Sequence, residues 1–448
     1  MDVSLDLFAL GVASGDPTHE SVVLWTRLIG DDLPDRAPLV WELAYDSGFV
    51  ELAATGVIEV VPDLAHSAHV EAVGLPSATT FHYRFRTGTA ISAVGQTRTM
   101  PADGTDVAKV RIGVSSCQLI ETGHWAAHED IAAADLDLMV WLGDFIYGGG
   151  GFSNYEGRSH IGGDPTTLAD YRARYAQYRQ DPVLQRASAA HPWLVTWDDH
   201  EVDNDYDAGV DPVRRAAAYQ AWWEHQPTRL PAPGSEGGSA SDGFAVYRSV
   251  DLGDLCRVTV LDARQYADDS TLLGDEQRTW LAGQLDNGAS WALLGSPVLV
   301  GGLLVPGQET LLPYTWDGYP LERAWLAEQL AARPNRICLS GDLHSSAALT
   351  VSADPADRSL PVVATEFMAP AISSEFPPDV APFVPFIPLA NAHIEHIDTK
   401  NGWLMLDIEP HRVTATFRHV IDVGDPNSAI ASFPRYEVLA GDPVPHPL

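Results

Sequence analysis

Short runs of alternating apolar and polar residues fill the first hundred residues of the chain. Turn residues such as Gly15-Asp16-Pro17 separate the runs, and no helical period interrupts them. Alternation with period two is typical of half-buried strands, and several such strands in succession predict an antiparallel β-sandwich. The runs cover residues 22–25, 39–43, 57–61, 69–73 and 81–86. Because residues 100–104 form a Pro- and Gly-containing linker, we expect an immunoglobulin- or fibronectin III-like sandwich over residues 1–104.

After the linker, apolar strands alternate with helical periods, which indicates a layered α/β domain over residues 105–448. Strands are expected at residues 109–115, 138–142, 193–197, 258–261, 291–294, 337–339, 362–367, 403–408 and 413–418. Helices are expected at residues 125–134, 168–179, 213–225, 276–285 and 321–332. Residues 148–151 and 376–390 are rich in Gly or Pro, so we expect long loops there, and such loops often line or cover a site.

Polar groups that could coordinate a metal follow four of the expected strands. They are Ser116-Cys117, then Gly143-Asp144 with Tyr147, then Asp198-Asp199-His200-Glu201 with Asp203-Asn204-Asp205, and finally Gly341-Asp342-Leu343-His344. Open α/β sheets bind ligands just past the carboxyl ends of their strands. Buried carboxylates need compensating charge, so the repeated pattern predicts cations between these strand ends.

Taken singly, each of these residues has an ordinary structural explanation. Tyr147 alone would more often be a half-buried aromatic residue, and Cys117 a small core residue. His344 alone would be a hydrogen-bonded imidazole, while Asp198 and Asp199 could form a turn. Only their shared position after apolar strands favours a joint site.

The chain carries 61 acidic and 27 Lys or Arg residues, a formal net charge of −34. This charge repels nucleic acids and anionic membranes and attracts cations, although most of the carboxylates are expected on a solvated surface. No apolar run approaches the roughly 20 residues of a membrane span. Cys117, Cys256 and Cys338 lie too far apart in sequence to suggest a disulfide framework.

The four strand-end motifs resemble those of the calcineurin-like metallophosphoesterases. That family has a ligand pair after its first strand, Gly-Asp after the second, Gly-Asn-His-Glu after the third and Gly-His-x-His late in the chain. Here Cys117 replaces the first pair, Asp199 stands for the asparagine, and Asp342 stands for the first late histidine. With these three departures, the motifs resemble those of one branch of the family, the PhoD-like alkaline phosphatases. The resemblance to this branch extends over nearly the whole chain.

The resemblance implies a role for each of these residues. Asp144 would bridge two metals, and Cys117, Tyr147 and His344 would complete a site for Fe3+, which suits thiolate and phenolate donors. Asp199, Asn204 and Asp342 would form an all-oxygen site, which favours one or two Ca2+ ions or another divalent metal. Asp198 would be either a ligand or a partner of one. His200 would hydrogen-bond the phosphoryl oxygen or protonate the leaving alkoxide.

The implied activity is phosphoester hydrolysis, in which a metal-bound hydroxide attacks phosphorus in line. An alternative is a phosphodiesterase or phospholipase D-like hydrolase of cell-envelope polymers or phospholipids. A non-catalytic, calcium-binding adhesion module is a third hypothesis, but it does not need a thiolate, a phenolate and an imidazole together. No protein partner is evident, and the substrate would be a phosphate mono- or diester.

The expected location depends on the resemblance as well. PhoD-like enzymes are typically exported, so we expect a secreted, periplasmic or cell-envelope protein. The beginning of the chain has neither a basic start nor an apolar stretch, so no export signal is visible in it.

Overall fold

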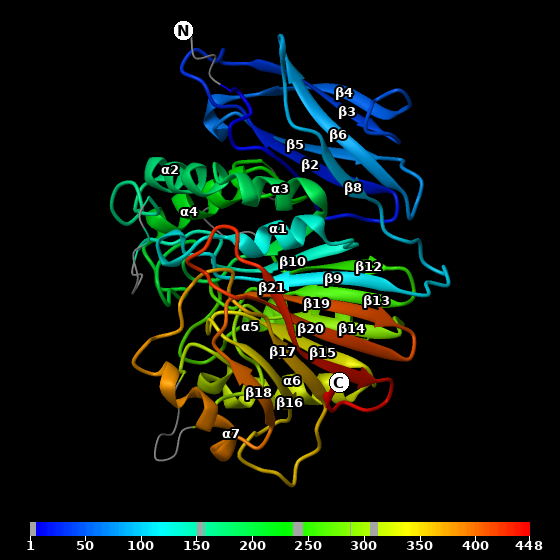
Figure 1. The fold of residues 1–448 in the computed structure, drawn as a ribbon, viewed down its shortest axis with the longest axis vertical. Coiled ribbons are helices and arrows are strands. Elements are labelled where there is room, and N and C mark those ends of the chain that lie inside the picture. The colour runs from blue at the N-terminus through cyan, green and yellow to red at the C-terminus, as the bar shows by residue number, and fades with distance from the viewer. Residues whose placement is uncertain (1–5, 150–154, 156, 236–244, 287, 305–311) are drawn as a thin grey trace.

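The computed structural model describes residues 6–149, 155, 157–235, 245–286, 288–304 and 312–448. These residues form three β-sheets with helices packed against them (Figure 1). The predicted mixed α/β class is therefore confirmed. All three cysteines are buried, and none of them forms a disulfide, as their spacing predicts. Among the described residues, no helix is long and apolar enough to cross a membrane.

The largest sheet has ten strands, and three parallel strands form its centre. β9 (Val110–Ser115), β10 (Leu138–Leu142) and β11 (Pro192–Thr196) pair in this order. Every residue of β10 is buried, because the strand is covered on both faces. This explains why its sequence is apolar throughout. On the β9 side the sheet continues antiparallel through β19 (Gly402–Glu409), β20 (Arg412–Val420), β21 (Ile430–Leu439) and β22 (His446–Pro447).

A seven-stranded sheet packs face to face against this one. Its order is β12 (Arg248–Leu252), β13 (Cys256–Val260), β14 (Trp291–Gly295), β15 (Arg336–Ser340), β17 (Ala364–Met368), β16 (Ser346–Val351) and β18 (Ile394–Asp398). Strands β13, β14, β15 and β17 are parallel neighbours. Val140 and Leu142 of the first sheet share one core with Val258, Leu293 and Leu339 of the second. The two sheets therefore present parallel strand ends to the same edge of the molecule.

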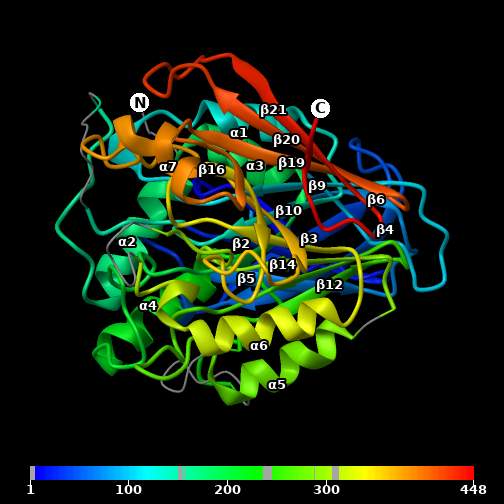
Figure 2. The ribbon, with the colours of Figure 1, turned by 90° about the horizontal axis from the view of Figure 1, so that it is seen from below.

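Helices cover the outer faces of both sheets. The first sheet packs against α1 (Ala126–Ala133), α2 (Leu168–Arg179), α3 (Pro182–Ala190) and α4 (Pro212–His225), and the second against α5 (Gly274–Leu285) and α6 (Pro320–Ala331). Figure 2 shows α5 and α6 side by side on the face opposite β19 to β21. The sequence predicted five of these helices within two residues of their ends and missed α3, a nine-residue helix capped by Asp181.

The predicted loop at residues 376–390 is wrong in its second half. Residues there form the 3-10 helix η4 (Ala381–Phe386) and α7 (Ile387–Ala390). Proline is tolerated in the first turn of a helix, so Pro382 and Pro388 do not prevent these turns. Of the loop expected at residues 148–151, only Gly148 and Gly149 lie within the described residues. Three more 3-10 helices are η1 (Pro62–Leu64), η2 (Ile120–Thr122) and η3 (Trp316–Gly318).

The N-terminal strands divide between two sheets that share a core. β4 (Leu52–Val60), β3 (Ala37–Ala44), β6 (Thr80–Thr87) and β7 (Ala90–Ile91) form the third sheet, with β8 (Gly95–Arg98) paired to β6. It packs against β1 (Val12–Gly15), β2 (Ser21–Arg27) and β5 (Ser67–Val73). These last three strands continue the ten-stranded sheet, because β1 pairs in parallel with β11. The boundary expected at residue 104 stays a prediction, since the sheet runs across it.

The β1–β11 junction leaves no room for a side chain at Gly15. A Cβ there would lie 2.6 Å from the Trp193 carbonyl oxygen and also against the Pro227 carbonyl oxygen. We therefore expect Gly15→Ala to lower the free energy of unfolding by about 1–3 kcal/mol, measured by urea denaturation. Gly283→Ala is the control: Gly283 lies in α5 with nothing within 4 Å, so alanine should stabilise by about 0.5 kcal/mol. Equal effects of the two substitutions would contradict this account of the junction.

Candidate metal centre

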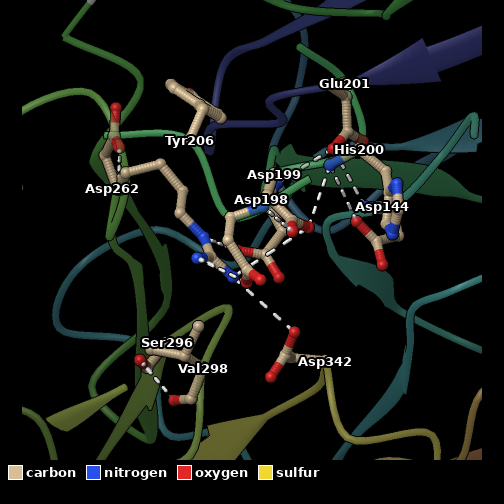
Figure 3. A network of polar contacts seen from close by, with 12 residues as sticks. Asp144, Asp198, Asp199, His200, Glu201, Tyr206, Asp262, Ser296, Val298 and Asp342 are labelled. Atoms are coloured by element: carbon tan, nitrogen blue, oxygen red, sulfur yellow. Dashed lines mark hydrogen bonds and ion pairs between the residues drawn. The ribbon is translucent and has the colours of Figure 1, made fainter. Parts of the chain in front are cut away.

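The ends of β9, β10, β11 and β15 meet at one place in the structure, as the strand-end pattern predicts. The chain takes unusual backbone conformations there, with positive φ at Cys117 (56°), Asp144 (57°), Asp342 (65°) and His344 (47°). Non-glycine residues rarely adopt this region, and such residues cluster where the backbone must aim side chains at a site. Figure 3 shows Asp144, Asp198, Asp199 and Asp342 around a common space.

The glycine in each Gly-Asp pair is required by close packing between strand ends. Gly143 has a φ of +95°, and a Cβ there would lie 2.5 Å from the backbone nitrogen of Asp198. At Gly341, a Cβ would lie 2.6 Å from Ser116 Oγ. Each glycine thus lets one strand end approach the next, which brings the following aspartate into the shared space.

Cys117, Asp144, Tyr147 and His344 form the first group of possible ligands. Cys117 Sγ lies 3.4 Å from Asp144 Oδ2, and the Tyr147 hydroxyl donates to the same oxygen at 2.7 Å. His344 Nε2 lies 3.2 Å from Tyr147 Oη, while His344 Nδ1 lies 2.7 Å from the Glu375 carbonyl oxygen. A proton on Nδ1 therefore bonds to that carbonyl and leaves Nε2 as an electron-pair donor.

Asp198, Asp199 and Asp342 form a second group with oxygen atoms only. One carboxylate oxygen of each lies within 4.8 Å of the others. A third group, made of Asp144, Asp199 and His200, overlaps the other two. The overlap places Asp144 and Asp199 side by side between a mixed sulfur, nitrogen and oxygen set and an all-oxygen set.

Burial controls the protonation of these groups. It raises the pKa of Asp144 well above its usual value, and the negative charges of Asp199 and Asp198 raise it further. Burial and then the Asp144 charge likewise raise the pKa of Cys117 and of Tyr147. Burial lowers the pKa of His344 to about 4, so its imidazole is neutral near pH 7 and suited to bind a metal. A cation among the acids would favour their anionic forms.

Two buried oxygens support the presence of a cation. Asp198 Oδ2 and Asp342 Oδ2 have no hydrogen-bond partner among the described residues. Unsatisfied buried carboxylate oxygens are costly, and a metal ion would satisfy both. The donor types fit as well, because thiolate, phenolate and imidazole suit a transition metal and carboxylates suit a hard divalent ion.

His200 and Asn204 lie beside these groups. The His200 backbone N–H donates to Asp199 Oδ1 at 2.9 Å and lies 3.3 Å from Asp144 Oδ1. The His200 ring is tilted by 34° against the Tyr147 ring, with 4.1 Å between the ring centroids. Asn204 is exposed, and its amide donates to Asp205 Oδ2 at 2.8 Å. Both residues line a cavity of about 250 Å³ together with Asp203 and Arg214.

Two residues of this centre had no assigned role in the sequence analysis. Glu201 accepts three backbone N–H groups, from Asp144 (3.0 Å), Phe145 (2.6 Å) and Asp198 (3.0 Å), and so ties the end of β10 to the end of β11. Arg264 Nε donates to Asp198 Oδ1 at 2.5 Å. A signal existed for Arg264, because it follows a buried strand, as the predicted ligands do.

The pKa directions predict how pH affects the metal-free protein. Burial raises the pKa of Glu201 to about 8, and the pKa values of Asp144 and Asp342 are also raised by burial. A carboxyl group with a raised folded pKa stabilises the fold at low pH, and this contribution is lost as pH rises through that pKa. In the presence of chelator, we therefore expect Tm to fall between pH 7 and 9. The free energy of unfolding should drop by up to about 1.4 kcal/mol per pH unit for each proton that the folded state holds and the unfolded state does not.

Metal-loaded protein is the control for this prediction. Bound cations take the place of the protons, so its Tm should change much less over the same range. A metal-free Tm that does not vary between pH 7 and 9 would contradict the assignment of these acids as protonated.

Known proteins share this fold. A solved structure described as the structure of PhoD superposes with a TM-score of 0.93 at 34% identity, covering 100% of this chain and 93% of that one. The purple acid phosphatase PPD1 from yellow lupin seeds gives a TM-score of 0.60 at 12% identity, covering 94% of this chain and 74% of that one. At that identity the second likeness shows a common fold alone.

Sequence comparison identifies the family. Alkaline phosphatase D of Bacillus subtilis (strain 168) is 36% identical over 470 aligned residues, covering 95% of this chain and 79% of the relative. The model of the PhoD-like phosphatase N-terminal domain matches residues 2–101, and that of the PhoD-like phosphatases matches residues 112–417. The chain therefore belongs to the PhoD-like phosphatase family.

Proposed function

We propose that the protein is a metal-dependent phosphoester hydrolase of the alkaline phosphatase D type. Membership of the PhoD-like phosphatase family supports this function. The observation that carries it is the overlap of the three possible ligand groups at Asp144 and Asp199. Two neighbouring cations held in this way form a common device for hydrolysing phosphoesters, because they stabilise both the attacking and the leaving oxygen.

The two groups differ in the metal that suits them. We assign Fe3+ to Cys117, Asp144, Tyr147 and His344, because three anionic donors balance three positive charges. We assign Ca2+, or another divalent ion, to the oxygen donors Asp199 and Asp342 with Asn204. Asp198 can serve both suggested roles, since its Oδ1 is held by Arg264 and its Oδ2 has no partner among the described residues.

Bound cations would supply the chemistry of water activation and charge neutralisation, by lowering the pKa of water and offsetting the phosphoryl charge. The protein's own part is positioning. Glu201 fixes the loops that carry Asp144 and Asp198, and the Glu375 carbonyl fixes His344. Cys117 serves as a ligand here, so no covalent protein intermediate is required.

We assign His200 as the catalytic residue that contacts the substrate. Its backbone is held by Asp199, and its half-buried ring lines the cavity next to both groups. From this position its imidazole can hydrogen-bond a phosphoryl oxygen or deliver a proton to the leaving alkoxide. The cavity offers space for the alcohol part of the ester.

The assignment predicts a catalytic defect without loss of metal. His200→Ala should lower kcat for a chromogenic phosphate monoester by about 10²–10⁴-fold, with metal content by elemental analysis unchanged. His411→Ala, at an exposed histidine, is the control. We expect the wild type to hydrolyse the monoester faster than the diester of the same alcohol. The reverse order would favour the phosphodiesterase alternative, and turnover of neither ester would contradict the function.

Iron bound to the Tyr147 phenolate predicts a visible charge-transfer band in protein purified without chelator. Tyr147→Phe should abolish or strongly shift this band, because the phenolate is lost. Tyr175→Phe is the matched control, since Tyr175 is equally buried but lies among core aromatic residues. A colourless, iron-free protein with full activity would rule out the iron assignment.

The finer description of the fold and the location belong to the same proposal. We infer an α/β/β/α catalytic arrangement, supported by helices on the outer faces of both central sheets, and an immunoglobulin-like sandwich in the N-terminal region, supported by its shared core. We also infer that the protein acts outside the cytoplasm, which accords with calcium at the oxygen donors.

A further inference from the structure

We propose that Arg264 determines which metal charge the oxygen donors accept. This inference rests on the proposed function, because it takes Asp198, Asp199 and Asp342 as the surroundings of a cation. Arg264 would act as a permanent positive charge within that group and restrict it to a divalent ion. Its role concerns metal specificity, and it need not touch the substrate.

The position of Arg264 is suited to this role. The residue is 2% exposed, and its Nε donates to Asp198 Oδ1 at 2.5 Å. Its Nη2 atom lies 3.6 Å from Asp342 Oδ1 and 3.9 Å from Asp199 Oδ1. One guanidinium group is therefore shared by all three carboxylates, and its Nη1 atom also lies 3.8 Å from Asp205 Oδ1.

The arginine is held in place from its own loop. Asp262 Oδ1 accepts the backbone N–H of Arg264 at 2.9 Å and that of Gln265 at 3.0 Å, directly after β13. The Tyr314 ring lies 5.5 Å from the guanidinium carbon. The charge is thus a fixed part of the centre.

The contacts of Arg264 go beyond a simple structural pair with Asp198. The Nη2 atom is buried, has no hydrogen-bond partner among the described residues, and lies within 4 Å of both Asp199 and Asp342. Asp198 Oδ2 and Asp342 Oδ2 are equally without partners. The group is therefore neutralised only in part by the arginine and has oxygens left to bind an ion.

The balance of charges gives the expected specificity. The three largely buried carboxylates carry −3, Arg264 contributes +1, and the remaining −2 matches one divalent cation. The fourth partner of Arg264, Asp205, has a 46% exposed side chain, so water and salt screen its charge. In the group assigned to iron, the anionic forms of Cys117, Asp144 and Tyr147 also carry −3. No arginine or lysine among the described residues forms an ion pair with Asp144, so this charge is not reduced. Since buried charge is costly unless balanced, the two groups should select ions that differ by one charge.

A competition between Ca2+ and Tb3+ tests the inference directly. The two ions have similar oxygen chemistry and differ in charge, and the buried Trp197 beside Asp198 can sensitise Tb3+ luminescence. The protein is purified with its iron retained and freed of weakly bound ions with a mild chelator. The measured quantity is the ratio of the two dissociation constants.

Removal of the charge should shift the preference toward the trivalent ion. We expect Arg264→Gln to raise the affinity for Tb3+ relative to Ca2+ by about tenfold or more, because unit charges about 4 Å apart interact strongly even at an effective dielectric constant of about 20. Arg264→Lys keeps the charge, so its ratio should stay within about twofold of the wild type. Arg412→Gln, at an exposed arginine, is the control for ions bound at the surface.

A charge-compensating variant distinguishes the effect of the lost charge from an effect of misfolding. Arg264→Gln leaves three buried acids together, whereas Arg264→Gln combined with Asp342→Asn restores −2 and should restore a ratio near that of the wild type. An unchanged ratio in Arg264→Gln, or an equal shift in Arg264→Lys, would overturn the role of the charge while leaving the phosphatase proposal intact. Failure of the wild type to bind either ion would instead overturn the metal assignment itself.

Discussion

The organisation of this protein depends on the concentration of buried negative charge where β9, β10, β11 and β15 end. Four aspartates, a cysteine and a tyrosine lie together, and all of them except the partly buried Asp342 are fully buried. Charges in such surroundings must be balanced by protons, by arginine or by metal ions. Burial raises the pKa of Asp144 and of Asp342, which favours their protonated forms, and Arg264 pairs with Asp198. Metal ions are what the arrangement is suited to accept.

The surrounding fold holds these groups together against their repulsion. Two mixed sheets with parallel central strands pack through one apolar core and bring the ends of these strands to a common edge. Gly143 and Gly341 allow close approach there. Glu201 is a buried acid whose oxygens accept hydrogen bonds from the backbone N–H groups of two loops and so hold these loops together. The rigid sheets thus supply the stability that an unfavourable electrostatic site requires.

The N-terminal region contributes to the same framework through the β-sheet itself. Because β1 pairs with β11, strands from the first hundred residues extend the sheet that carries Asp144 and Asp199. The alternation of apolar and polar residues predicted β2 and β5 but not β1, and it holds no information about which edge of the sheet these strands join. Gly15 marks the junction, since only a residue without a side chain fits between the two neighbouring carbonyl oxygens.

The sequence by itself determined the central strands of both large sheets, most helices and the residues at the strand ends, because local periodicity and turn chemistry depend on nearby residues. It missed several strands nearer the sheet edges, among them β12, β16, β18 and β21. It also located Cys117, Asp144, Tyr147, Asp199 and His344 at the ends of apolar runs. Only the tertiary structure decided how the groups share the space: that Asp144 and Asp199 lie side by side, that Glu201 ties two loops, and that Arg264 is shared by three acids. These relations join residues far apart in the chain, so no local pattern could encode them.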